Sequence, residues 1–325
     1  MEGSPRRMTA GRRFIGVLVA PGLVTAIVLG CGQSMLGVRQ RTVAEPPAPA
    51  ASSLPALSAT ASLVPAATSV PASSTTSPLE RFTTSELAPE ARRVAEAITS
   101  VFENSTPQLQ YGYSVALDDG RGITAGRAGF TSATGDLVVV VRRYIEMKPS
   151  SPLEPFLPVL EGLDEVKSDD TSALSGFAAA WRIAAEDPVM RAVQDDVVNE
   201  LYYNPAMGYA ASLGAVLPLT LAALYDTIIQ HGNGSDPDGL AALIAETNSA
   251  AGITLPVGVN EMRWLEVFLS VRKQHLLHSF APETRTAWAA SAGRSDALLD
   301  LAAQSEWALD APVRLRAFDS TWVIN

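Results

Sequence analysis

The chain has 325 residues, of which 47% are hydrophobic and 18% charged, and this composition excludes a wholly disordered or collagen-like protein. The formal net charge of −10 argues against a nucleic-acid partner, because phosphate contacts need a basic surface. A single cysteine excludes an internal disulfide framework.

Residues 1–30 have the order of a secretory signal: a basic segment ending in Arg12-Arg13, then an apolar stretch. That stretch is shorter than the roughly 20 residues a spanning helix needs, so an uncleaved membrane anchor is the weaker alternative. The sequence Val28-Leu29-Gly30-Cys31 resembles a bacterial lipobox. We therefore expect Cys31 to be lipidated and to hold the protein at the bacterial cell surface. The alternative is a conventional signal peptide and secretion.

Residues 31–78 predict a tether, because Thr42 to Pro78 consists mostly of Ala, Pro, Ser and Thr and cannot build a core. The expected folded part is 79–325. The first 79 residues hold six arginines and two glutamates, so the chain from Glu80 onward carries a net charge of −14. Such a surface concentrates cations and favours a positively charged substrate, although acidic surfaces also simply keep proteins soluble.

Helical periodicity dominates the folded part. The expected helices are Pro89–Phe102, Leu137–Met147, Ala173–Ala185, Pro188–Tyr203, Met207–His231, Pro237–Ser249, Asn260–His278 and Glu283–Ala303. Between Gln108 and Thr131, alternating residues around a Gly-rich turn predict short strands. The predicted fold class is α+β, mainly α, with a small sheet among helices.

Two carboxylates stand where regular structure gives way to a turn. Glu103 ends the first long helix, where the helix dipole disfavours a negative charge, and Asp119 lies in a Gly-rich turn. Glycosidic cleavage uses two carboxyls in unlike environments, one protonated and one ionised. On spacing alone, both residues are better explained as solvated surface groups.

Several segments in order carry a family resemblance. They are Phe102-Glu103-Asn104-Ser105, Leu109-Gln110-Tyr111-Gly112-Tyr113, 119–126, 129–136, Asp195-Asp196, Tyr203-Asn204-Pro205-Ala206, Tyr225-Asp226, His231-Gly232, Phe268-Leu269, Arg272-Lys273 and Trp322-Val323-Ile324-Asn325. Together they resemble the signature of family 46 chitosanases over roughly residues 88–325.

The resemblance implies an endo-acting, inverting hydrolase of β-1,4-linked glucosamine polymers, with a lysozyme-like, two-lobed helical fold and a small sheet beside the cleft. By the same resemblance Glu103 is the general acid, Asp119 is the general base, and Thr124 helps to position the attacking water. Inversion requires the two carboxyls to stand farther apart than the ~5 Å of a retaining pair.

Supporting residues also follow from the resemblance. Arg121, Asp196 and Arg272 match a buried polar network that orients the acid. Asp136 has two interpretations, a helix N-cap before Leu137 and, from the family match, a binder of a substrate ammonium group.

Two positions depart from the family pattern. Ile123 stands where an aromatic residue is general, which puts a sugar contact there in doubt. Residues 252–254 lack an arginine that some members carry, which predicts weaker coupling around Glu103.

The expected partners are chitosan or partly deacetylated chitin oligomers, with no cofactor and no metal. We expect a monomer with no nucleic-acid partner, and membrane contact only through the lipid anchor. The alternatives are a non-catalytic glycan-binding lipoprotein and a hydrolase of another amino-sugar polymer, such as peptidoglycan.

Overall fold

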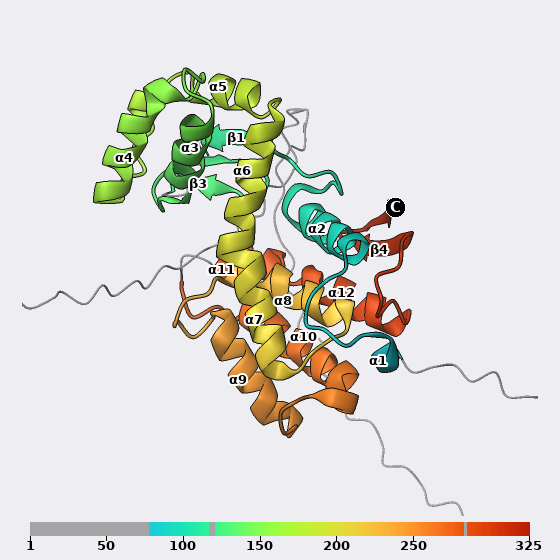
Figure 1. Cartoon of the computed structure of the whole chain (residues 1–325). Coiled ribbons are helices and arrows are strands. Elements are labelled where there is room, and N and C mark those ends of the chain that lie inside the picture. Colours follow the sequence, from blue (N-terminus) through green and yellow to red (C-terminus); the bar gives the residue numbers. More distant parts are fainter. Residues whose placement is uncertain (1–77, 117–120, 283–284) are drawn as a thin grey trace, which may run out of the picture. The chain divides into compact units, whose positions relative to one another are not determined.

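A computed structural model gives the structure of the protein and describes residues 78–116, 121–282 and 285–325 (Figure 1). The α-helices are α1 (Pro78–Arg81), α2 (Pro89–Asn104), α3 (Asp136–Met147), α4 (Leu157–Val166), α5 (Phe177–Ala184), α6 (Pro188–Val198), α7 (Asn204–Leu213), α8 (Pro218–His231), α9 (Leu240–Ala251), α10 (Glu261–Leu277), α11 (Arg285–Ala290) and α12 (Gly293–Ala303). Short 3-10 turns are η1 (Glu154–Phe156), η2 (Ser172–Leu174) and η4 (Gly258–Asn260), and η3 (Asn199–Tyr203) is a π-helical turn. The strands are β1 (Ser114–Ala116), β2 (Ile123–Ala125), β3 (Phe130–Thr131), β4 (Val313–Ala317) and β5 (Ser320–Ile324).

The small sheet lies where the sequence predicts it. Strands β1, β2 and β3 are antiparallel in that order, and Thr124 in the central strand faces Val115 on one side and Thr131 on the other. Helix α5 contacts β1 and helix α3 contacts β3, while α4 packs on α3 (Figure 1). The prediction of a mainly helical α+β fold with a small sheet is confirmed.

One continuous helical run, α6–η3–α7, leads from this sheet to the helices of the C-terminal half (Figure 1). Our prediction of a break around Asn204 is wrong, because the chain remains helical through Pro205. Proline has no N–H to donate, and the π turn just before it accommodates the lost bond, with the Asn204 N–H donating to the Asn199 carbonyl. The run ends at Gly214, which adopts a left-handed φ of 67°.

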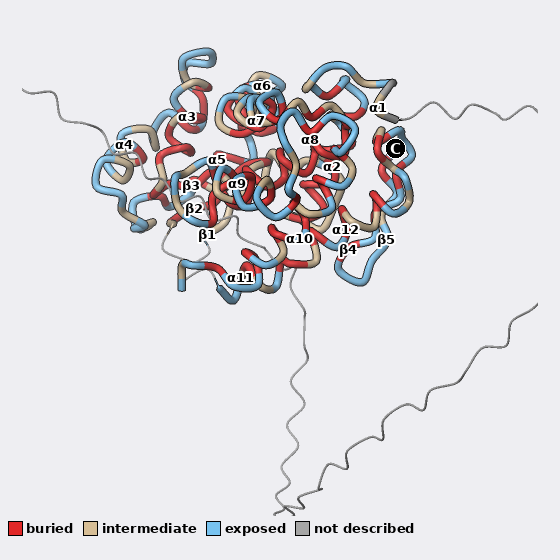
Figure 2. The backbone as a smooth tube through the Cα atoms, turned by 90° about the horizontal axis from the view of Figure 1, so that it is seen from below, coloured by how far each residue is buried: buried red, intermediate tan, exposed pale blue. Residues whose placement is uncertain are grey.

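Helix α8 is buried along its whole length, and α2, α7, α9, α10 and α12 pack around it. Figure 2 shows the buried stretches concentrated among these helices, with exposed segments outside. A helix surrounded on all sides must be apolar all round or must pair its polar groups internally. Helix α8 carries both kinds of residue, and its polar ones include Asp226 and Gln230.

The sequence analysis did not foresee the hairpin of β4 and β5. Its first strand alternates buried and exposed residues, so the period-2 signal in Val313-Arg314-Leu315-Arg316-Ala317 was present in the sequence. The ring of Phe318 in the hairpin turn packs edge-on against Phe102, with 6.2 Å between ring centroids. The hairpin therefore supports α2 immediately beside Glu103.

Within the described part of the chain, no helix combines the length and the apolar character needed to cross a bilayer.

Candidate active site

Helix α2 places Glu103 in its last turn. The helix begins at Pro89, which a first turn tolerates, and buries Val94, Ile98 and Val101 along one face. It ends before Ser105, whose left-handed φ of 53° closes the last turn. The side chain of Glu103 is 16% exposed, so it is largely buried and still reaches solvent.

A chain of buried ion pairs begins at Glu103. Arg294 of α12 donates from Nη1 to Glu103 Oε1 at 2.6 Å and from Nη2 to Asp226 Oδ1 at 2.7 Å. On the far side of Asp226, Nη2 of Arg272 lies 2.7 Å from Oδ2 and donates a hydrogen bond of 3.0 Å to Gln230. The side chains of Arg272, Asp226 and Arg294 are at most 1% exposed.

Asp226 and Arg294 each favour the charged form of the other. Burial raises the pKa of Asp226, but the attraction of Arg294 and Arg272 outweighs it and brings the pKa down to about 2. Burial lowers the pKa of Arg294, and the carboxylates of Asp226 and Glu103 more than offset it, so the pKa is raised. Asp226 is therefore an anion, and it fixes a charged Arg294 against Glu103.

Arg294 is held by packing as well as by charge. Its guanidinium lies 5.2 Å from the centroid of the Phe102 ring, the residue next to Glu103. Two fixed donors and one aromatic contact leave this guanidinium little freedom. The weaker coupling around Glu103 expected from the missing arginine at 252–254 stays a prediction.

Asp226 and Arg294 were given no role in the sequence analysis. Tyr225-Asp226 stood among the matching segments, and the position of Asp226 in a mostly apolar stretch was the available signal. Arg294 offered no comparable signal, because its partner Glu103 is 191 residues away in sequence. Arg272 was expected in this network, and it contacts Asp226 within it.

Asp196 lies outside this network. Its side chain is exposed on α6, so it cannot belong to a buried network around Glu103, and that expectation is wrong. The neighbouring Asp195 is the partly buried one, and it pairs with Arg127 instead. Arg121 is half-buried beside β2, and its carbonyl accepts a hydrogen bond from the Ala133 N–H at 3.1 Å.

Thr124 lies in the central strand and is 5% exposed. Its Oγ1 is buried and has no hydrogen-bond partner among the residues that the structure describes. Ile123, the departure from the family pattern, is also buried in β2. Asp119, the expected base, lies outside the described residues, in the segment that joins β1 to β2, and Cys31 also lies outside them.

We expected Asp136 to be the N-cap of α3. The N-cap is instead Gly135, and Asp136 is the first residue of the helix. Its Oδ1 accepts hydrogen bonds from the N–H groups of Thr131 (2.8 Å) and Leu137 (3.0 Å) and from the hydroxyl of Thr134 (2.7 Å). The side chain therefore ties β3 to the start of α3. Burial raises the pKa of Asp136, and these hydrogen bonds oppose that rise.

No group of three potential metal ligands occurs in the part of the chain that the structure describes.

Comparison with known proteins places this site in a family. The model of glycosyl hydrolase family 46 matches residues 97–313. The chitosanase of Bacillus subtilis is 46% identical over 228 residues, which cover 70% of this chain and 82% of that protein. The structure of a Gynuella sunshinyii family 46 chitosanase in complex with chitotetraose aligns with a TM-score of 0.69 and 49% identity, covering 74% of this chain and 99% of that one.

A mutant chitosanase of Bacillus subtilis complexed with 6 GlcN aligns with a TM-score of 0.70 and 44% identity, covering 74% of this chain and all of that one. A mainly helical fold with a small sheet, a carboxyl group held by a buried arginine and these matches define the class of protein: it is a glycoside hydrolase with the lysozyme-like fold. Within that class, the chain belongs to glycosyl hydrolase family 46.

Proposed function

We propose that the protein is an endo-acting chitosanase that hydrolyses β-1,4 bonds between glucosamine units with inversion. The observation that carries the proposal is the contact between Glu103 and Arg294, because a carboxyl at the end of a buried ion-pair chain has a fixed position and partial access to solvent. Membership of family 46 and the names of the chitosanase relatives support the choice of substrate.

Glu103 acts as the general acid in this proposal. It gives its proton to the leaving glycosidic oxygen, which requires the carboxyl to be protonated when the substrate binds. Once the proton has left, the Nη1 donor of Arg294, 2.6 Å from Oε1, stabilises the carboxylate that forms. Asp226 keeps Arg294 in place throughout, because its own charge persists down to about pH 2.

Asp119 is the proposed general base. It follows β1 and precedes Arg121 and β2, so it lies on the hairpin whose second strand contains Thr124. The Thr124 Oγ1, which has no partner among the described residues, is free to bind the attacking water. The water and the acid then act on opposite faces of the sugar, which inverts the anomeric centre.

The substrate is a polycation, and the net charge of −14 after Glu80 raises its local concentration. We assign Asp136 the binding of one ammonium group, with Arg121 and Asp196 contacting other parts of the polymer. The carboxylate form of Asp136 attracts an ammonium group, and the hydrogen bonds that Asp136 accepts oppose the rise in its pKa caused by burial.

The N-terminal residues complete the proposal. Residues 1–30 direct export, Cys31 carries a lipid after cleavage, and residues 31–78 hold the catalytic domain, 79–325, away from the membrane. One acyl chain binds a bilayer only marginally, so stable retention at the cell surface needs more than one. Mass spectrometry of the mature N-terminus tests this part, and an unmodified N-terminus elsewhere in the chain contradicts it.

The experiment for the function compares three polymers at equal mass concentration: chitosan, fully acetylated chitin and peptidoglycan. We expect rapid release of reducing ends from chitosan and little from the other two. NMR of the first products from a chitosan oligomer should show the α anomer. Wall lysis without chitosan cleavage would contradict the substrate, and an initial β anomer would contradict inversion.

A further inference from the structure

A second group of charges, with a buried arginine at its centre, lies apart from the Glu103 chain. Arg127 is its centre, with a side chain that is 4% exposed. Its Nη2 lies 3.2 Å from Glu96 Oε2, and its Nη1 donates to Asp195 Oδ1. Glu96 is also paired with Arg92, whose Nε lies 3.1 Å from Oε1. Two guanidinium groups and two carboxylates thus alternate along this cluster.

The cluster joins three elements of the fold. Glu96 belongs to α2, seven residues and therefore about two turns before Glu103 on the same face of the helix. Arg127 follows β2, three residues after Thr124, and Asp195 belongs to α6. The Arg127 guanidinium therefore contacts α2, the helix that carries the proposed acid. The backbone of Arg127 follows directly on β2, the strand that contains Thr124.

The base of that hairpin is fixed to α6 by backbone contacts. Gln194 accepts a hydrogen bond from the Arg127 N–H at 3.1 Å and donates one to the Tyr111 carbonyl at 3.2 Å. Gly126 passes so close that a Cβ there would lie 2.5 Å from the Gln194 amide oxygen, and its φ is +77°. The hairpin is thus positioned against α6, and the Arg127 side chain extends this connection to α2.

The contacts favour a permanently charged Arg127. Burial lowers its pKa, and the nearby Tyr225, Glu96 and Asp195 more than offset this, so its pKa is raised. Tyr111 donates to Asp195 at 2.8 Å and places its ring 5.7 Å from the guanidinium. Burial raises the pKa of Tyr111 to about 12, so this hydroxyl keeps its proton as a donor.

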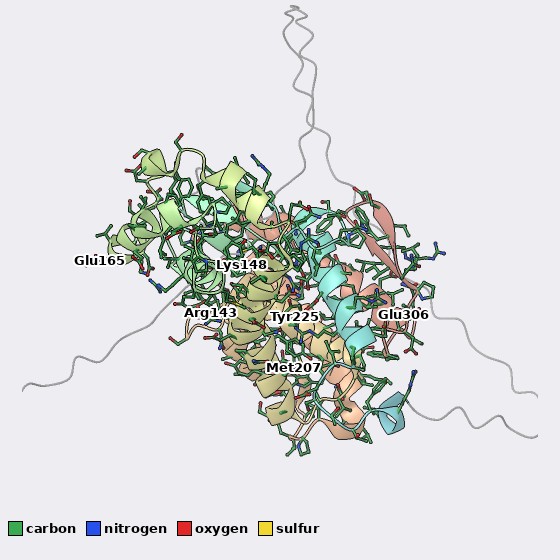
Figure 3. The ribbon with its side chains drawn as sticks, turned by 45° about the horizontal axis from the view of Figure 1, so that its top comes forward. Arg143, Lys148, Glu165, Met207, Tyr225 and Glu306 are labelled. Atoms are coloured by element: carbon green, nitrogen blue, oxygen red, sulfur yellow. The ribbon has the colours of Figure 1, made fainter. Side chains whose placement is uncertain are left out.

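Helix α8 connects the two groups of charges. Tyr225, labelled in Figure 3, precedes Asp226 and is buried, with its ring 5.9 Å from that of Tyr203. Arg92 stacks over the Tyr203 ring at 4.0 Å. Helix α2 therefore carries Glu103 and also Arg92 and Glu96 of the Arg127 cluster, while α8 carries Asp226 and, beside that cluster, Tyr225.

Resting on the proposed function, we propose that Arg127 is a positioning residue that sets the distance between Glu103 on α2 and Thr124 on β2. Buried ion pairs add little net stability compared with apolar packing, but they do fix the relative register of the elements they join. An inverting enzyme depends on such register, because the water must fit between its base and the anomeric carbon.

The test uses Arg127→Lys and Arg127→Met in the full chain, with Glu261→Gln as the matched control. Glu261 is a fully buried carboxylate in α10 that accepts from the N–H groups of Val216 and Leu217, so its loss perturbs the fold without touching the cluster. Activity on chitosan is measured well below each variant's melting temperature. Crystal structures give the distance between the Cα atoms of Glu103 and Thr124.

We expect kcat of Arg127→Met to fall by about 10- to 100-fold with KM changed less than about threefold, because misplacement by about 1 Å costs that much. Arg127→Lys, which keeps the charge, should recover part of the rate. Glu96→Gln should add little to the loss in Arg127→Lys, since the two act together. The Glu103–Thr124 distance should shift by about 1 Å in Arg127→Met and stay unchanged in Glu261→Gln.

Wild-type kcat in both Arg127 variants would overturn the proposal. The proposal would also be overturned if kcat fell only in step with the melting temperature, as in Glu261→Gln. If Arg127→Met does not fold, Arg127→Lys and Asp195→Asn give the same comparison. An inactive wild-type protein would contradict the proposed function alone, because the crystallographic distances still decide the role of Arg127.

Discussion

Arg294 donates a hydrogen bond of 2.6 Å to Glu103 while its other Nη group holds Asp226 at 2.7 Å. The residue proposed to give up a proton is therefore bound to a cation whose own position is fixed by a buried anion. The guanidinium therefore lies where it can stabilise the carboxylate that remains on Glu103 after proton transfer. The predictions below follow from this arrangement and from the residues around it.

Asp226→Asn should destabilise the protein strongly. The change leaves Arg272 and Arg294 fully buried with their shared counter-ion removed, and breaking a buried ion pair costs about 3–5 kcal/mol. Urea denaturation at pH 7 measures the loss. Glu165→Gln, which changes an exposed carboxylate labelled in Figure 3, is the control and should stay within about 0.5 kcal/mol of wild type. A loss below about 1 kcal/mol for Asp226→Asn would contradict the ion-pair chain.

The same pair should show a defined pH dependence. The pKa of Asp226 is depressed from its ordinary 3.8 to about 2 in the folded protein, so its stabilising contribution is present above about pH 4 and is lost as pH falls towards 2. We expect the difference in unfolding free energy between wild type and Asp226→Asn to narrow across that window. Thermal denaturation followed by circular dichroism from pH 5 to pH 2 measures it, and a constant difference would refute the assignment.

Thr124→Val should separate activity from stability. Valine has nearly the same shape, and it removes a buried hydroxyl that has no partner among the described residues, so stability should stay within about 1 kcal/mol of wild type or rise. If the hydroxyl positions water, kcat on chitosan should fall about tenfold or more with KM little changed. Retention of full kcat would show that Thr124 has no part in the reaction.

Asp136→Asn distinguishes the two interpretations of that residue. The amide oxygen of the variant can still accept from the N–H groups of Thr131 and Leu137, so the connection of β3 to α3 should survive. The amide is neutral, so the variant does not bear the cost of burying a carboxylate charge. A role in binding ammonium predicts that KM for chitosan rises about tenfold, and that this rise diminishes at high salt. An unchanged KM with reduced stability would leave Asp136 a structural residue.

Much of the fold follows from local signals in the sequence. The apolar face of α2, the run after Asp136 and the Gly-rich strands all lie where periodicity predicts them. The break expected near Asn204 does not occur, because the π turn before Pro205 accommodates the hydrogen bond that proline cannot donate. The presence of a proline does not by itself indicate such a turn. By contrast, the predicted helix Ala173–Ala185 is interrupted at Gly176. This residue takes a left-handed φ of 86° between η2 and α5.

The candidate site was predictable only in part. Glu103 and Arg272 stood out through sequence motifs, whereas Arg294 lies far from Glu103 in sequence and the pairing depends on how α12 packs beside α2 and α8. Asp195 and Asp196 are adjacent and chemically alike, and only the rotation of α6 decides that the first turns inward to Arg127. Whether Asp119 and Thr124 act on one water stays a prediction.

The most direct test of the central claim compares reducing-end release from chitosan by wild type and Glu103→Gln at equal concentrations of folded protein. Glutamine keeps the shape of the side chain and can still accept from Arg294, but it has no acidic proton to give. The account predicts a fall of kcat by at least about 100-fold for Glu103→Gln, with melting temperature close to wild type. Equal release by both proteins would contradict it.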